Sequence, residues 1–270
     1  MTGRVWLNLF AFTCIIGGMF VLNQIKDREI DKENNKLFLL ADGYISLAGA
    51  VIETVIVYGA GLGIGFFLFG FQNGLMLTAL AILGGYLYNY EPFNWKNKPF
   101  LGLLTNVLGG FTMFGAGWTL LADVSLQTIY SAIPYLAGFA AVTLLTMVPD
   151  EAGDTVHHKE TFIVKFGLNP TIYTATGFIL IAAIGGALNG DPLILGAAVL
   201  SLPWYIYASV KPGVESSLGA TRFSALFLGL AISTKFPVYL LLLAATFFLA
   251  RFYYRKRFGL NYPALNMDKG

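Results

Sequence analysis

Apolar residues run along most of the chain in stretches that end at Gly, Pro, Asn or charged residues. Nine such stretches occur, approximately Val5–Leu22, Ile45–Phe69, Leu75–Tyr88, Phe100–Ala122, Ile129–Val148, Thr171–Leu188, Leu193–Tyr207, Gly219–Thr234 and Pro237–Phe252. Several are shorter than the ~20 residues that a perpendicular helix needs to cross a bilayer, so we expect tilting or extension into flanking residues. The pattern predicts an all-α, polytopic membrane helix bundle with about nine transmembrane helices.

Composition supports the membrane class and removes several others. Of 270 residues, 56% are hydrophobic and 12% are charged, whereas a soluble domain carries roughly 25% charged residues. The net charge of +2, with no basic patch interleaved with aromatic residues, gives no indication of a nucleic-acid partner. The single cysteine, Cys14, lies inside an apolar run, which excludes a disulfide framework or a thiolate metal site.

The placement of positive charge predicts the orientation in the membrane. When the polar intervals are assigned alternately to the two sides, every Lys and Arg except Arg4 and Lys235 falls on the side reached after the first helix. Positive residues gather on cytoplasmic loops. We therefore predict an integral protein of the cell or inner membrane, with the long polar loops 23–44, 89–99 and 149–170 facing the cytoplasm.

The first apolar stretch leads directly into a polar run from Asn23 to Asp31. If the helix continues through it, Asn23, Asp27 and Asp31 are spaced i, i+4 and i+8 and lie on one face. Such a face suits a hard cation like Mg²⁺, which takes carboxylate oxygens and keeps waters that a phosphate can replace. The alternative is the end of a juxtamembrane helix whose mixed charges only solvate it.

A second acidic pair lies in the loop 149–170. Asp150 and Asp154 are again four residues apart, and Lys159 follows them. Two such pairs on one side favour a joint site for metal and anion over solvated loops. A pair of Mg²⁺ ions bridged by a diphosphate would neutralise a leaving group, with lysines adding charge stabilisation. An allylic diphosphate would leave a delocalised cation, which aromatic ring faces stabilise.

Three stretches resemble the motifs of the UbiA superfamily of intramembrane prenyltransferases. The run Asn23–Asp31, with its Asp-Arg-Glu-Ile-Asp core, is similar to the first aspartate-rich motif. Asp150–Asp154, followed by Lys159-Glu160-Thr161, resembles the second, and Tyr88–Lys96 resembles the tyrosine-proline-lysine loop. The motifs occur in the family's order, and the resemblance covers residue 5 to about 234.

The resemblance implies a helix bundle around a central cavity that opens sideways to lipid. It implies one Mg²⁺ site formed by Asn23, Asp27 and Asp31 and another formed by Asp150 and Asp154. Its candidates for holding the diphosphate are Arg28, Lys159 and either Lys96 or Lys98, of which Lys96 fits better. Tyr88 is expected close to the cation. The simpler alternatives are that the lysines only set topology and that Tyr88 is an interfacial anchor.

The implied function is Mg²⁺-dependent transfer of an isoprenyl group from its diphosphate to an aromatic acceptor, such as a quinone precursor or a chlorophyllide-like tetrapyrrole. Two departures stand against a full match. Gln24 stands where the family usually has aspartate, and the sequence starts almost directly at the first motif-bearing helix, where the family has one helix before it. Either the start codon is misplaced, the sequence is a fragment, or the bundle closes without that helix. We expect residues 1–234 to form the prenyltransferase-like bundle, and residues 235–270 to add a transmembrane helix and a basic cytoplasmic tail.

Glu53 is a further candidate, because it is the one carboxylate well inside a predicted span. It would bind the acceptor's polar group or act as a base, or be a protonated acid between helices. Two other functions remain open. A small membrane transporter would need ionisable residues or broken helices near the bilayer middle and an internal repeat, and a noncatalytic relative would only bind isoprenoid lipid. A CDP-alcohol phosphotransferase is not supported, because its aspartate-glycine-alanine-arginine signature is absent.

Overall fold

The computed structural model describes residues 3–33 and 38–261, without the side chains of Ile30, Asp31, Glu33 and Phe38. Within these residues every regular element is helical. Eight helices are long and apolar enough to cross a membrane, and the shorter apolar segment Phe71–Leu87 makes a ninth. The predicted all-α membrane bundle is therefore confirmed.

The eight long helices correspond to eight of the predicted stretches, and the segment Phe71–Leu87 corresponds to the ninth, Leu75–Tyr88. The long helices are α1 (Gly3–Glu33), α3 (Leu47–Ile64), α5 (Pro99–Trp118), α6 (Leu126–Thr146), α9 (Leu168–Leu188), α10 (Pro192–Val210), α11 (Val214–Lys235) and α12 (Pro237–Phe258). α3 continues as the π-helix η1 (Gly65–Phe69), and α4 (Phe71–Leu80) continues as the π-helix η2 (Ala81–Leu87). The connections contain α2 (Phe38–Ala41), η3 (Trp95–Asn97), η4 (Val148–Asp150), α7 (Glu151–Val156) and α8 (Phe162–Phe166).

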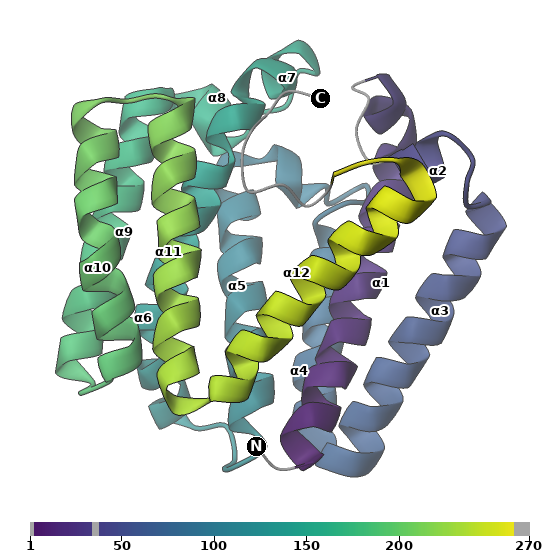
Figure 1. The fold of residues 1–270 in the computed structure, drawn as a ribbon, viewed down its shortest axis with the longest axis horizontal. Helices are drawn as coiled ribbons and strands as arrows, with labels where there is room; N and C mark the ends of the chain where they lie inside the picture. The colour runs from purple at the N-terminus through teal and green to yellow at the C-terminus, as the bar shows by residue number, and fades with distance from the viewer. Residues whose placement is uncertain (1–2, 34–37, 262–270) are drawn as a thin grey trace.

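Two groups of helices make up the bundle (Figure 1). Buried residues of α6, α9, α10 and α11 form one hydrophobic core. A second core joins α1, α4 and η2 to α5, and α3 packs against α1. α5 lies between the groups, because it packs on α4 and also on α6. α12 crosses obliquely from the foot of α11 towards α2, where the ring of Phe258 meets Tyr44 edge to face at 5.7 Å.

Small residues bring the helices close together. A Cβ atom at Gly61 of α3 would lie 2.8 Å from the carbonyl oxygen of Ala11 in α1. At the α9–α10 contact, a Cβ atom at Gly186 would lie 2.9 Å from the backbone nitrogen of Leu195. Lipid supplies no hydrophobic force between helices, so close packing of small residues and hydrogen bonds between helices hold such bundles together.

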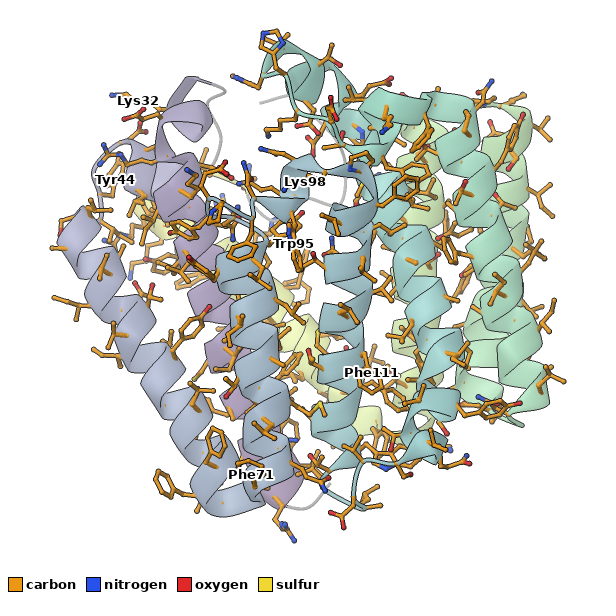
Figure 2. The ribbon with its side chains drawn as sticks, turned by 180° about the vertical axis from the view of Figure 1, so that it is seen from behind. Lys32, Tyr44, Phe71, Trp95, Lys98 and Phe111 are labelled. Atoms are coloured by element: carbon orange, nitrogen blue, oxygen red, sulfur yellow. The ribbon has the colours of Figure 1, made fainter. Side chains whose placement is uncertain are left out.

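One hydrogen-bonded cluster of this kind joins α1, α4 and α5. Asn73 of α4 is fully buried, and its amide nitrogen lies 2.9 Å from both the Ala116 carbonyl oxygen and the Thr119 hydroxyl. Asn8 of α1 donates to the same Ala116 oxygen at 3.0 Å. This cluster lies at the end of the bundle where Phe71 is labelled, opposite Lys98 and Trp95 (Figure 2).

Two of the predicted polar loops are partly or largely helical. α1 continues past Leu22 to Glu33, as the face formed by Asn23, Asp27 and Asp31 required, because its charged continuation contains no Gly or Pro and consists largely of good helix formers. The stretch 149–170 is largely helical rather than a loop, since η4, α7 and α8 lie in it. The end of the bundle that carries the last turns of α1, residues 88–98 and residues 148–167 is called the motif end below. The C-terminal helix is present as α12, and residues 262–270 of the tail lie outside the described residues.

Candidate active site

The continuous α1 helix places the first pair of candidate ligands on adjacent turns. The Asn23 amide nitrogen donates to Asp27 Oδ2 at 2.9 Å, so both side chains lie on the same face, as the spacing predicted. Asp31 follows one turn later on the same helix, but its side chain lies outside the described residues. The helix thus presents at least one amide and one carboxylate at the motif end.

Lys96 joins this pair from the turn before α5. Its Nζ lies 2.7 Å from Asp27 Oδ1 and 2.6 Å from Oδ2, and its side chain is only 11% exposed. The backbone N–H of Lys96 donates to the Tyr88 carbonyl oxygen at 3.1 Å, which fixes the turn. Lys98, two residues later, is exposed at the N-cap of α5. The structure therefore distinguishes the two lysines between which the sequence did not decide: Lys96 contacts Asp27, and Lys98 is exposed.

Burial changes the acid strength of Lys96. Removal from water disfavours the ammonium form and lowers the pKa of Lys96 below its ordinary value, although the ion pair with Asp27 acts in the opposite direction. The positive charge of Lys159 also contributes to the lowering. Because Lys159 belongs to the second acidic motif, the two motifs lie within electrostatic reach of each other.

The second motif is built on η4 and α7. Asp150 ends η4 and Asp154 lies one helical turn later, so the two carboxylates share a face. The Nζ of Lys159 donates to Asp154 Oδ1 at 3.1 Å, and the two side chains are 23% and 13% exposed. Each motif therefore pairs one partly buried aspartate with one lysine.

Tyr88 lies between the two motifs. Burial raises the pKa of the Tyr88 phenol, and the negative charges of Asp154, Asp27 and Asp150 raise it further. A hydrogen bond with the Asn106 side chain of α5 opposes the shift. Three carboxylates from the two acidic motifs thus act on one hydroxyl group, which stays neutral at physiological pH and marks the centre of the site.

Three predicted site residues are not brought to this centre. Arg28 is exposed on α1, beside a surface hollow that also includes Glu29, Lys32 and Asp42. Lys98 is exposed, as described above. Glu53 is exposed on α3 among the exposed side chains Ile52, Val55 and Ile56, which form the outer surface of the helix. Their roles in binding remain predictions.

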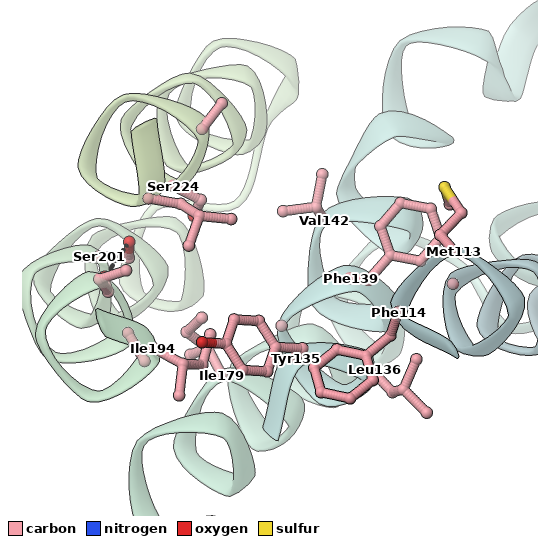
Figure 3. Close-up of a pocket in the computed structure, with 16 residues that line it drawn as sticks. Met113, Phe114, Tyr135, Leu136, Phe139, Val142, Ile179, Ile194, Ser201 and Ser224 are labelled. Carbon is pink, nitrogen blue, oxygen red and sulfur yellow. Dashed lines mark hydrogen bonds between the residues drawn. The ribbon is translucent and has the colours of Figure 1, made fainter. Parts of the chain in front are cut away.

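An apolar cavity of about 380 Å³ lies deeper in the bundle, between α5, α6, α9, α10 and α11 (Figure 3). Its lining includes Met113, Phe139 and Ile179, with the hydroxyl groups of Ser201 and Ser224 among its few polar atoms. Gly110, which also lines it, lies roughly 16 Å along α5 from Pro99 at about 1.5 Å per residue. The cavity is therefore well below the charged residues of the motif end.

A family model described as the UbiA prenyltransferase family matches residues 2–216. The chain belongs to this family. It is 27% identical over 260 residues to 2-acylphloroglucinol 4-prenyltransferase of Humulus lupulus, covering 87% of this chain and 62% of that protein. It is 26% identical over 191 residues to the bacteriochlorophyll synthase 34 kDa chain of Chloroflexus aurantiacus, covering 68% of this chain and 60% of that protein. The chain thus spans about three fifths of the length of these relatives.

Solved UbiA structures share the fold. A UbiA homolog from Archaeoglobus fulgidus, bound to GPP and Mg²⁺, superposes with a TM-score of 0.67 at 20% identity, covering 86% of this chain and 88% of that chain. The digeranylgeranylglyceryl phosphate synthase structure gives a TM-score of 0.64 at 19% identity, covering 84% and 82%. The predicted membership in the UbiA superfamily is confirmed by the family match and by this architecture.

The side chains of this UbiA-family site suit magnesium. Asn23, Asp27, Asp150 and Asp154 offer only carboxylate and amide oxygens, which are hard ligands. Among the described side chains, no three Asp, Glu, His or Cys residues lie close enough together to hold one ion. Mg²⁺ typically binds through one or two carboxylates, with water and substrate phosphates completing its octahedron. The donor set therefore fits a metal that arrives with a phosphate ligand.

Sequence reasoning missed two asparagines that support the site. Asn89 is 1% exposed and accepts a hydrogen bond from Asn23 at 2.7 Å. Asn106, in the middle of α5, lies close enough to the Tyr88 phenol to oppose the rise in its pKa. The sequence did offer one signal: an asparagine in or beside an apolar stretch needs hydrogen-bond partners when it is buried.

Proposed function

We propose that this UbiA-family protein is an integral membrane prenyltransferase. It would transfer an isoprenyl group from its diphosphate to an aromatic acceptor in a Mg²⁺-dependent reaction. The observation that carries this proposal is the convergence of two acidic motifs, each paired with a lysine, on Tyr88 at one end of the bundle. Such a site can hold a diphosphate and a cation together.

The proposed ligands of the metal are Asn23 and Asp27 on α1, with Asp31 beyond them, and Asp150 of η4 and Asp154 of α7. Bound Mg²⁺ would supply the positive charge that makes the diphosphate a good leaving group. Lys96 and Lys159 would hold the phosphate oxygens, and their carboxylate partners keep both ammonium groups at the site. The buried position of Lys96 strengthens its attraction for an anion.

The bond that breaks is the one between the allylic carbon and the diphosphate oxygen, and the electron pair leaves with the diphosphate. The resulting allylic cation is attacked by a carbon of the acceptor ring, which then loses a proton. Tyr88 would support this step as a neutral phenol, and the raised pKa of its hydroxyl is consistent with that form. Its ring face also stabilises a nearby cation by roughly 0.5–2 kcal/mol.

The cavity below the site offers a place for the isoprenoid tail. Its lining comes from five helices and is almost entirely apolar, as an isoprenoid requires. A diphosphate held by the two motifs would leave its hydrocarbon directed into the membrane-spanning part of the bundle. The charged motif end would bind the diphosphate, and the apolar interior would bind the hydrocarbon tail of the same substrate.

Names of the relatives support an aromatic acceptor. They include prenyltransferases acting on 2-acylphloroglucinol and on homogentisate, and a bacteriochlorophyll synthase. Quinone precursors and related ring compounds are therefore the acceptors that we propose to test first. The distribution of Lys and Arg supports a motif end that faces the cytoplasm of a cell or inner membrane.

The test is product formation by the protein purified in detergent. It would be supplied with Mg²⁺, geranylgeranyl diphosphate and a panel comprising a hydroxybenzoate, a naphthoate, homogentisate and a chlorophyllide, and the products identified by mass spectrometry. We expect one acceptor class to gain the isoprenyl mass. Tight binding of the diphosphate with no product from any acceptor would favour a noncatalytic isoprenoid-binding protein, and ion flux in proteoliposomes without product would favour a transporter.

A further inference from the structure

We propose that Asn89 is a positioning residue that sets the orientation of the Asn23 amide for metal binding. This inference rests on the proposed function, since it concerns one of the proposed Mg²⁺ ligands. Asn89 follows the π-helix η2, is 1% exposed, and hydrogen-bonds through both ends of its amide group. Its position links the end of η2 to the last turns of α1.

The π-helix fixes which way the Asn89 amide points. At the end of η2 the Tyr88 N–H reaches back five residues to the Leu83 carbonyl, and the Asn89 N–H donates to Tyr86. The carbonyls of Gly84 and Gly85 instead accept from the Asn89 side-chain nitrogen, at 2.9 and 3.2 Å. Only the NH₂ group can serve two carbonyls, so the Asn89 oxygen has to face the other way.

That oxygen faces Asn23. The Asn23 amide nitrogen lies 2.7 Å from Asn89 Oδ1 and 2.9 Å from Asp27 Oδ2, so both of its hydrogens are used. Its own oxygen, the one atom of the amide that can bind a cation, takes part in neither of these two bonds. Without Asn89, only the bond to Asp27 holds the Asn23 nitrogen, and the amide can turn over and present NH₂ to the metal.

Two further contacts hold η2 and α1 at the spacing that this arrangement needs. The Tyr90 hydroxyl donates to the Leu22 carbonyl oxygen at 3.2 Å, one residue before Asn23. Gly85 allows a close approach, because a Cβ atom there would lie 3.2 Å from Leu22 Cδ1. The orienting contact is therefore part of a fixed interface rather than a chance encounter of two exposed side chains.

The experiment is a double-mutant cycle on metal affinity. Free Mn²⁺ is measured by electron paramagnetic resonance in the presence of detergent-purified protein, with and without inorganic pyrophosphate. The variants are Asn89→Ala, Asn23→Ala and the double variant. Asn73→Ala is the matched control, because Asn73 is an equally buried amide that donates to a backbone carbonyl at the opposite end of the bundle.

We expect Asn89→Ala to weaken Mn²⁺ binding by about 10- to 100-fold, as removal of a residue that orients a metal ligand typically does. In the Asn23→Ala background the same change should cost nothing further, because its effect passes through Asn23. Asn73→Ala should lower thermal stability and leave Mn²⁺ affinity unchanged.

Additive losses of Mn²⁺ affinity in the double variant, or an equal loss in Asn73→Ala, would overturn the inference. If Asn89→Ala binds Mn²⁺ normally, the role of Asn89 is wrong and the proposed function still stands. If the wild type does not bind Mn²⁺ with pyrophosphate, the proposed function is wrong as well.

Discussion

At the scale of single residues, the site depends on which lysine reaches Asp27. Lys96 and Lys98 are separated by one residue, yet one ammonium group is buried against a carboxylate and the other is exposed. Removal of one member of a buried ion pair strongly destabilises the folded protein, because the remaining charge stays desolvated without its partner. The two positions therefore provide a matched pair of variants.

We expect Lys96→Ala to lower kcat/KM for the isoprenyl diphosphate by about 10²- to 10³-fold, the usual loss when one preorganised charge donor is removed. Lys98→Ala should leave kcat/KM close to the wild-type value. Steady-state kinetics at saturating Mg²⁺ measure both. An equal loss in the two variants would show that the lysines act only through the general positive charge of this end of the bundle.

At this scale, side-chain positions could be predicted from the sequence where the backbone is helical and not where it is irregular. The helical period correctly related Asn23 to Asp27 and Asp150 to Asp154, because i, i+4 geometry holds wherever the backbone is helical. The choice between Lys96 and Lys98 lay in an irregular turn, where no period applies. The position of Glu53 could not be predicted in the same way, because an apolar stretch does not reveal which face of a membrane helix meets the other helices. Glu53 lies on the exposed face of α3.

At the scale of helices, α1, which carries the first motif, packs closely against α3. Gly61 faces Ala11 so closely that an added methyl group would meet the Ala11 backbone oxygen at 2.8 Å, and a backbone atom cannot simply rotate away. Gly59 of the same helix has nothing within 4 Å of the corresponding position. The two glycines differ in their surroundings but not in their helix.

Gly61→Ala should lower the free energy of unfolding by about 1–3 kcal/mol, the usual cost of overpacking. Gly59→Ala should leave stability unchanged or slightly higher, because Ala favours the helix. Thermal unfolding in detergent, followed by fluorescence, compares the two with the wild type. Equal behaviour of the two variants would mean that α1 and α3 are not in this close contact.

Helix ends were harder to predict than helices. The hydropathy pattern located all the long helices, because an apolar stretch in a membrane has to satisfy its own backbone hydrogen bonds. It did not locate the end of α1, since the charged residues after Leu22 stop the apolar run without stopping the helix. The π-helix η2, against which α1 packs, was not predicted, and neither was the proposed role of Asn89.

At the scale of the whole molecule, a charged end and an apolar interior are built from different helices. The cavity is lined by α5, α6, α9, α10 and α11, whereas the first acidic motif lies on α1. The sequence predicted a cavity only through the family resemblance. Its size could not be derived from the sequence, because it depends on how side chains from five helices meet.

The cavity leads to a prediction about substrate length. Ala197 lines it and is 4% exposed, so Ala197→Phe should fit into the available space and shorten it. We expect KM for geranylgeranyl diphosphate to rise by roughly tenfold, as steric changes in an apolar pocket typically produce, with little change for dimethylallyl diphosphate. Val199→Phe, at an exposed position of the same helix, is the control. A similar change for both diphosphates would argue against the cavity as the site of the tail.

The most direct test of the central claim is metal-dependent release of pyrophosphate from geranylgeranyl diphosphate, measured with an acceptor present. The wild type is compared with Asp27→Ala and Asp154→Ala, each with Mg²⁺ and with EDTA. If both motifs hold the metal and its diphosphate, release requires Mg²⁺ and falls by about 10²-fold or more in each variant. Release that persists in EDTA, or that survives the loss of either aspartate, would contradict the account.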